Sequence, residues 1–190
     1  YDPSVVTAFL AATSTKVAVY ALLRFLFDVF GLEFALLDMP LDDILMVVGL
    51  AGILSASLVA VFQEDIKRML AYSSVAQIGY MVLGISLASN TGVTAATLHV
   101  FNHALMKGAL FLALGAVVYR IGGAGLRDFA GLGRRMPWTM AAIVLGGLSL
   151  IGVPPTAGFI SKWYLVLATL EQDLWPVAVL VVIGSLLALL

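Results

Sequence analysis

Long apolar runs separated by short polar segments make up most of the chain. A helix needs about 20 predominantly apolar residues to cross a bilayer, and six runs approach or exceed this length. They cover residues 3–27, 44–62, 69–88, 94–119 and 138–170, and a sixth begins near Trp175. We therefore predict an all-α, polytopic bundle of about six membrane-spanning helices.

The fifth run differs from the others because Gly-Val-Pro-Pro-Thr-Ala-Gly interrupts it at residues 152–158. A proline lacks the backbone N–H and its ring clashes with the preceding turn, so a continuous helix cannot pass Pro154 and Pro155. Irregular backbone inside a membrane is tolerated only where it is buried in protein or lines a watery cavity. We predict two half-helices joined by an unwound segment at membrane depth.

Charged residues between the runs are distributed asymmetrically. Basic residues follow the second and fourth runs, whereas acidic residues dominate after the first and fifth. The first group is Lys67, Arg68, Arg120, Arg127, Arg134 and Arg135, and the second is Arg24 with Asp28, Glu33, Asp38, Asp42, Asp43, Glu171 and Asp173. Because cytoplasmic loops are enriched in Lys and Arg, we predict that the basic side is cytoplasmic, together with the start of the first run.

Composition supports a membrane location and argues against several functions. Apolar residues make up 62% of the chain and charged residues 11%, against about 45–50% and about 25% in soluble domains. With no cysteine and two histidines, we expect no disulfide, haem, iron–sulfur cluster or other cofactor. The net charge of −1 gives no reason to expect nucleic acid. The chain begins at Tyr1 and stops inside an apolar run, so we expect it to be part of a longer protein.

Three of the four lysines fall inside the predicted spans. Lys16 lies near the middle of the first, Lys107 near the middle of the fourth, and Lys162 just after the break in the fifth. Each costs about 2.5–3.5 kcal/mol at a helix centre on insertion scales, and such residues commonly mark ion paths. The alternative is a lysine that packs between helices and bonds to backbone carbonyls.

His99, His103 and Lys107 recur at intervals of four residues, which places them on one helix face. Successive members stand about 6 Å apart along the helix axis, so one water can bridge each pair. Histidine titrates near neutral pH, and we predict a proton relay that also includes Lys16 and Lys162. One alternative is a zinc site, but no Asp or Glu accompanies the histidines in this span. Another is a pair of hydrogen-bonded core histidines. A hydrolytic triad lacks an acidic residue within reach, so no catalytic residue is expected.

Three segments in order along the chain resemble antiporter-like proton-translocating membrane subunits. These subunits occur in respiratory complex I, in membrane-bound hydrogenases and in Mrp-type cation/proton antiporters. The segments are QEDIKRMLAYSSVAQIGY at 63–80, HVFNHALMKGALF at 99–111 and GVPPTAGFISK at 152–162. The resemblance extends over essentially the whole chain.

The resemblance implies an arrangement of two inverted five-helix repeats, each with one broken helix. Residues 1–27 would be the last helix of the first repeat, and residues 44–190 would be the second repeat. By position, Lys16 is similar to the lysine that links two half-channels. Lys107 and the two histidines are similar to the relay along the second half-channel, and Lys162 to its terminal lysine.

The function implied is proton translocation as one subunit of a larger complex. We expect the nearest counterpart to be the D component of an Mrp-type antiporter, which would exchange protons for Na⁺ or K⁺. The first alternative is a pumping subunit of NADH–quinone oxidoreductase or a related hydrogenase. The second is a structural membrane subunit without transport. In each case the partners are other membrane subunits and the lipid of a bacterial or archaeal plasma membrane, and the chain itself carries out no covalent chemistry.

Overall fold

The computed structural model describes residues 4–31, 34 and 39–189, so Tyr1, Glu33, Asp38 and Leu190 lie outside the described residues. Within these ranges the regular structure is helical apart from one β-bridge between Asp65 and Gly125, which confirms the all-α class. The elements are α1 (Ser4–Arg24), η1 (Phe25–Phe30), α2 (Leu41–Val61), α3 (Ile66–Ser86), α4 (Asn90–Ile121), η3 (Leu126–Phe129), α5 (Leu132–Arg135), α6 (Pro137–Ile151), α7 (Ala157–Leu170) and α8 (Trp175–Leu187).

Within the part of the chain that the structure describes, four segments are long and apolar enough to cross a membrane, namely Val6–Phe30, Leu41–Val61, Ile66–Ser86 and Asn90–Ile121. The shorter apolar helices α6, α7 and α8 complete the bundle. Because α6 and α7 are the two halves of the broken fifth span, the prediction of about six spans is confirmed.

Helix ends follow local capping chemistry. The Asp65 side chain accepts a hydrogen bond from the backbone N–H of Arg68 at 3.0 Å, so α3 begins three residues before the apolar run that predicted it. Ser89 caps α4 in the same way through Gly92 N–H at 3.0 Å. Gly122 ends α4 in the left-handed conformation, with φ of 79°. An N-terminal side-chain acceptor and a C-terminal glycine satisfy groups that a helix end leaves unpaired.

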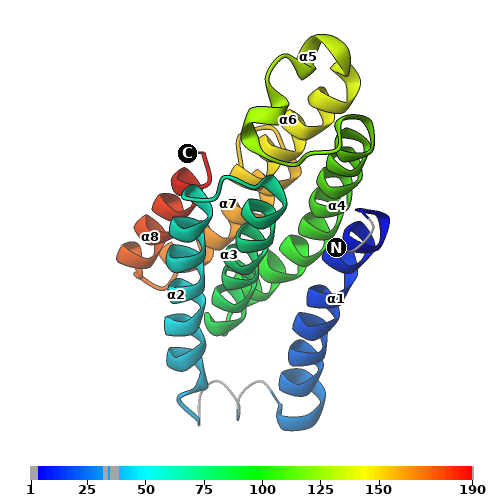
Figure 1. Ribbon diagram of the computed structural model, residues 1–190. Helices are drawn as coiled ribbons and strands as arrows, with labels where there is room; N and C mark the ends of the chain where they lie inside the picture. Colours follow the sequence, from blue (N-terminus) through cyan, green and yellow to red (C-terminus); the bar gives the residue numbers. More distant parts are fainter. Residues whose placement is uncertain (1–3, 32–33, 35–38, 190) are drawn as a thin grey trace.

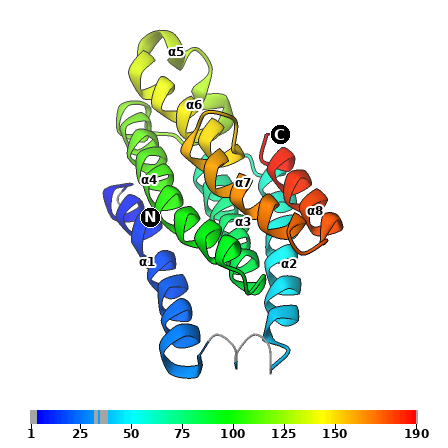
Figure 2. The same ribbon diagram turned by 180° about the vertical axis from the view of Figure 1, so that it is seen from behind.

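Helix α4 is the centre of the bundle. It contacts α1, α3, α6 and α7, while α2 packs on the far side of α3 and α8 packs against α2 and α7. Figures 1 and 2 show α1 along one side of α4 and α7 crossing it from the other. Three buried apolar clusters each contain residues of both α3 and α4, so these two helices hold the core and position the polar groups inside it.

The predicted break is present between α6 and α7. Gly152 ends α6 with φ of 91°, and residues 152–156 are not helical. The chain then folds back tightly, because a Cβ on Gly158 would lie 1.8 Å from the carbonyl oxygen of Ser149. The backbone N–H of Gly158 also donates to Ser149 Oγ at 3.2 Å. The first turn of α7 therefore lies directly against the last turn of α6.

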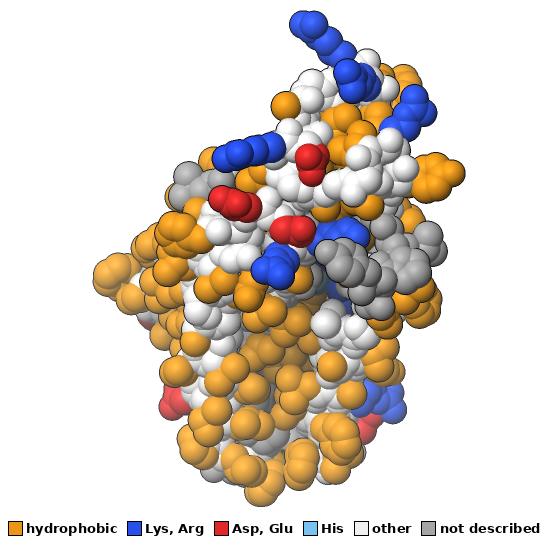
Figure 3. Space-filling model, in the orientation of Figure 1, with side chains coloured by type: hydrophobic (Ala, Val, Ile, Leu, Met, Phe, Trp, Pro, Cys, Tyr) orange, Lys and Arg blue, Asp and Glu red, His pale blue; other side chains and the backbone are white. Residues whose placement is uncertain are grey.

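Charge and hydrophobicity separate along the molecule. Lys and Arg side chains gather at the end that carries the α2–α3 turn and α5, while apolar side chains cover the opposite part in this view (Figure 3). Trp138 and Trp175 are 87% and 66% exposed, as expected for aromatic residues at a membrane interface. The basic end is the one that the sequence predicts to be cytoplasmic.

Candidate functional site

The five predicted relay residues are all buried. Lys16 of α1, His99, His103 and Lys107 of α4, and Lys162 of α7 are between 0% and 6% exposed. His103 lies within the electrostatic influence of the other four. Packing of α1 and α7 against α4 therefore brings the five basic groups into one buried region.

Lys107 reaches from α4 to α3. Its Nζ donates to Ser73 Oγ at 2.6 Å and to the carbonyl oxygen of Leu70 at 2.5 Å. Ser73 Oγ in turn lies 3.0 Å from the same Leu70 carbonyl. The ammonium is thus held by one hydroxyl and one carbonyl, both from the segment at 63–80.

Lys162 uses the break in the fifth span. Its Nζ donates to the carbonyls of Leu150 and Ile151 at 2.8 and 3.0 Å. These carbonyls belong to the last turn of α6. Carbonyls there lack helical partners, and the helix dipole gives this end a partial negative charge. The ammonium also lies 4.5 Å from the ring centroid of Tyr80, within the range of a cation–π contact. The broken helix therefore creates the acceptors that its own lysine occupies.

The two histidines differ in their surroundings. His99 has a partner on each ring nitrogen: Nδ1 lies 2.8 Å from Ser161 Oγ and Nε2 lies 2.8 Å from Gln77 Oε1. The His99 and His103 rings stack with centroids 6.2 Å apart, which matches the spacing predicted from the sequence. Neither ring nitrogen of His103 has a hydrogen-bond partner among the described residues. The alternative of hydrogen-bonded core histidines therefore fits His99.

Lys16 donates to the carbonyl of Ala11 in its own helix. All three buried lysines thus donate to backbone carbonyls. Relay and packing interpretations both predict such contacts, and substitution by arginine separates them. Among the described residues, Arg24 and Asp28 form an ion pair, and both side chains are substantially exposed. The described part of the chain thus supplies no carboxylate to the buried lysines, and an unpaired buried charge costs several kcal/mol.

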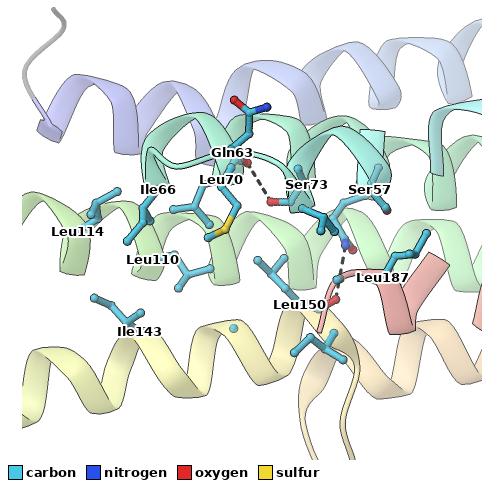
Figure 4. Close-up of a pocket in the computed structure, with 18 of the residues that line it drawn as sticks. Ser57, Gln63, Ile66, Leu70, Ser73, Leu110, Leu114, Ile143, Leu150 and Leu187 are labelled. Carbon is cyan, nitrogen blue, oxygen red and sulfur yellow. Dashed lines mark hydrogen bonds between the residues drawn. The ribbon is translucent and has the colours of Figure 1, made fainter. Parts of the chain in front are cut away.

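A cavity of about 230 Å³ adjoins this region (Figure 4). Its walls include the groups that hold three of the basic residues: Leu70 and Ser73 for Lys107, Leu150 and Ile151 for Lys162, and Gln77 for His99. Its other lining residues reach Val61, Gln63 and Leu126 at the basic end of the bundle. The cavity therefore extends from that end to the immediate partners of the buried bases.

Sequence reasoning did not single out the uncharged members of the site. Ser73, Gln77 and Tyr80 recur at i, i+4 and i+7 in α3, so they share the face that meets α4. This spacing of polar residues inside an apolar helix was the signal that could have found them. Ser161 lies beside Lys162 and carried no comparable periodic signal. The described residues contain no group of three or more His, Cys, Asp or Glu suited to a metal.

A bundle with a broken helix and buried lysines defines the chain as a multi-pass membrane protein of the antiporter-like class. It belongs to the family NADH:quinone oxidoreductase/Mrp antiporter, transmembrane, which matches residues 2–188. The resemblance found in the sequence is thereby confirmed.

Named relatives fall in more than one kind of complex. NADH-quinone oxidoreductase subunit N of Desulforudis audaxviator (strain MP104C) is 48% identical over 187 residues, which are 98% of this chain and 37% of that protein. A chain of the archaeal membrane-bound sulfane sulfur reductase is 36% identical with a TM-score of 0.85, and the match covers 98% of this chain and 38% of that one. A chain of the Mrp complex from Dietzia sp. DQ12-45-1b is 33% identical with a TM-score of 0.89, covering 98% and 34%. This chain thus spans little more than a third of the length of these relatives.

Proposed function

We propose that this chain is the second-repeat part of a proton-translocating subunit of the NADH–quinone oxidoreductase type. The observation that carries the proposal is the buried row of basic groups whose hydrogen-bond partners line a cavity reaching the basic end of the bundle. In this assignment residues 1–27 form the last helix of the first repeat, and residues 44–190 form the second repeat. Other membrane subunits of the same complex and the surrounding bilayer are its partners.

His103 is the central group of the proposed path. An imidazole with two uncommitted nitrogens can take a proton on one side and release it on the other. Water, which commonly satisfies buried polar groups, would connect His103 to Lys107 and to the other bases. Protons would pass between the cavity and Lys107, then through His103 toward Lys162 or across to Lys16.

Sequence identity supports one of the two transport assignments over the other. The Mrp-type antiporter was the first expectation, but the 48% identity to a subunit N exceeds the 33% identity to a chain of the Mrp complex. Fold similarity does not discriminate, because the chain matches a chain of the sulfane sulfur reductase and a chain of the Mrp complex with similar TM-scores, 0.85 and 0.89. The identity therefore favours the redox-driven alternative, and cation exchange with Na⁺ or K⁺ becomes the second candidate.

The test uses the full-length protein in its native complex in inverted membrane vesicles. Proton movement is followed with a pH-sensitive acridine dye. NADH starts proton uptake in one arm, and in the other a pulse of external Na⁺ or K⁺ tests for release of luminal protons in exchange for the cation. We expect NADH-driven uptake that falls at least about tenfold in His103→Gln, because an amide cannot take up a proton under these conditions. The control is Thr97→Val, since Thr97 bonds only to its own helix on the exposed side of α4.

Two other outcomes would support a different function. Proton movement that responds to the cation pulse and not to NADH would assign the chain to an antiporter. Unchanged uptake in His103→Gln, at normal amounts of assembled complex, would reject the relay and favour the structural subunit.

A further inference from the structure

The two hydrogen bonds of His99 determine which of its nitrogens carries the proton. The amide nitrogen of Gln77 faces the Leu150 carbonyl at 3.5 Å, so its oxygen faces His99. An amide oxygen can only accept, and His99 Nε2 must therefore be the N–H donor in this pair. Nδ1 is then an acceptor in the neutral ring, and it accepts from the hydroxyl of Ser161 at 2.8 Å.

Ser161 has a second acceptor within reach. Its Oγ lies 3.2 Å from the carbonyl of Gly158, but a hydroxyl has only one hydrogen to donate. A proton from the relay reaches Nδ1 of His99 through Ser161, whose hydroxyl passes its own hydrogen to Nδ1 as it receives another. Nδ1 is then a donor to Ser161 Oγ, and the new hydroxyl hydrogen turns to Gly158. A proton on His99 thus creates a hydrogen bond in the first turn of α7, one turn before Lys162.

Gln77 connects His99 to the same lysine by a second route. The Leu150 carbonyl that faces the amide of Gln77 also accepts from Lys162 Nζ at 2.8 Å. All of these side chains are at most 5% exposed, so bulk solvent does not compete for the bonds. His99 and Lys162 are therefore joined by shared partners, although they come from different helices.

We propose that Gln77 and Ser161 are positioning residues that hold His99 as its Nε2–H tautomer and connect its protonation to half-helix α7. This inference rests on the proposed relay and assigns different roles to its two histidines. Nε2–H stays hydrogen-bonded to the Gln77 amide oxygen, which cannot take its proton. His99 therefore gains and loses a proton only at Nδ1. The proton path runs through His103. His99 lies outside that path, and its protonation state affects Lys162 through their shared hydrogen-bond partners.

Other basic and aromatic groups surround His99 and are common to every variant tested. They are Lys162 from α7, Lys16 from α1, His103 from α4 and Tyr80 from α3, whose ring centroid is 5.8 Å from that of His99. A change confined to variants of Gln77 and Ser161 is therefore attributable to the hydrogen bonds of those two residues.

The first experiment measures the tautomer of His99 in the full-length complex. Infrared ring-stretch bands distinguish Nε2–H from Nδ1–H imidazole, and the His99 bands are assigned by difference from His99→Leu with labelled histidine. We expect the Nε2–H form in the wild type. In Gln77→Leu the population ratio of Nδ1–H to Nε2–H should rise by about 2- to 10-fold, because the Nε2–H form loses one neutral hydrogen bond.

The second experiment measures proton uptake per NADH oxidised. Ser161→Ala should keep the tautomer but lower uptake several-fold, and Ser161→Thr should restore it because the hydroxyl returns. A packing role predicts the reverse, since Ser161 is 1% exposed and threonine is larger than alanine. Ser55→Ala is the matched control, because its hydroxyl bonds only to Ala51 of its own helix at an exposed position.

The outcomes separate this inference from the proposed function. An Nδ1–H ring in the wild type would overturn the inference, and so would an unchanged tautomer in Gln77→Leu. If Gln77→Leu fails to assemble, the wild type still decides the tautomer. A tautomer that responds as expected, with no flux change in any variant including His103→Gln, would instead reject the proposed relay.

Discussion

Replacement of Lys107 by alanine in the full-length protein should abolish most proton movement and leave assembly largely intact. Removing the charge relieves an insertion cost of about 2.5–3.5 kcal/mol, while the two hydrogen bonds lost with the ammonium cost about 1.5–3 kcal/mol each. The two effects oppose each other, and the net destabilisation is at most about 3.5 kcal/mol. No orphaned partner remains, because Ser73 Oγ already lies 3.0 Å from the Leu70 carbonyl and can donate to it.

Lys107→Arg is the sharper half of this test. The cavity bounded by Leu70 and Ser73 gives the longer side chain room, so the variant should assemble. A guanidinium does not release its proton in proteins, and proton flux should therefore fail nearly as badly as in Lys107→Ala. A packing lysine predicts the opposite pattern, in which arginine rescues and alanine destabilises.

The assay pairs NADH-driven proton flux in vesicles with the amount of assembled complex on native gels. Lys67→Ala is the matched control, because Lys67 lies in the first turn of α3 at the basic end of the bundle. Flux in Lys107→Arg equal to that of the wild type would refute the relay and leave the packing lysine as the explanation.

Two further predictions concern the break and the aromatic contact. Gly158→Ala should sharply reduce the assembled complex, because its Cβ would lie 1.8 Å from the Ser149 carbonyl, whereas Gly147→Ala has open space and should assemble normally; equal amounts of the two variants on native gels would contradict the close contact. Tyr80→Phe keeps the ring 4.5 Å from Lys162 Nζ and loses only the hydroxyl that lies 3.3 Å from Ser185 Oγ, so it should retain more flux than Tyr80→Leu. Equal flux losses in the two Tyr80 variants would show that the cation–π contact does not contribute to proton flux.

Much of the fold could be predicted from local pattern. Apolar run length set the number of spans, and Pro154 and Pro155 located the break that the structure has after Ile151. Boundaries shifted by a few residues where polar caps extend a helix beyond its apolar run. Residues 66–68 belong to α3, for example, because Asp65 caps it.

The charged part of the site was also visible in the sequence. A lysine or histidine inside an apolar run is conspicuous because lipid penalises it, and all five such residues proved to be buried. Their spacing predicted that the two histidines share one face of α4, where the structure stacks their rings. The uncharged partners carry a much weaker penalty, and Gln77 and Ser161 were therefore not singled out.

Which groups meet was decided only by tertiary structure. His99 bonds to residues 22 and 62 positions away, and Lys107 to a serine 34 positions away. Helix periodicity cannot predict these contacts, because lipid tails are as apolar as a protein core and both faces of a membrane helix look alike in sequence. The sequence by itself thus determined the spans, the break and the buried charges. The packing of α3 and the two half-helices around α4 decided the tautomer of His99, the acceptors of each lysine and the cavity they adjoin, since these depend on how helices far apart in the chain approach one another.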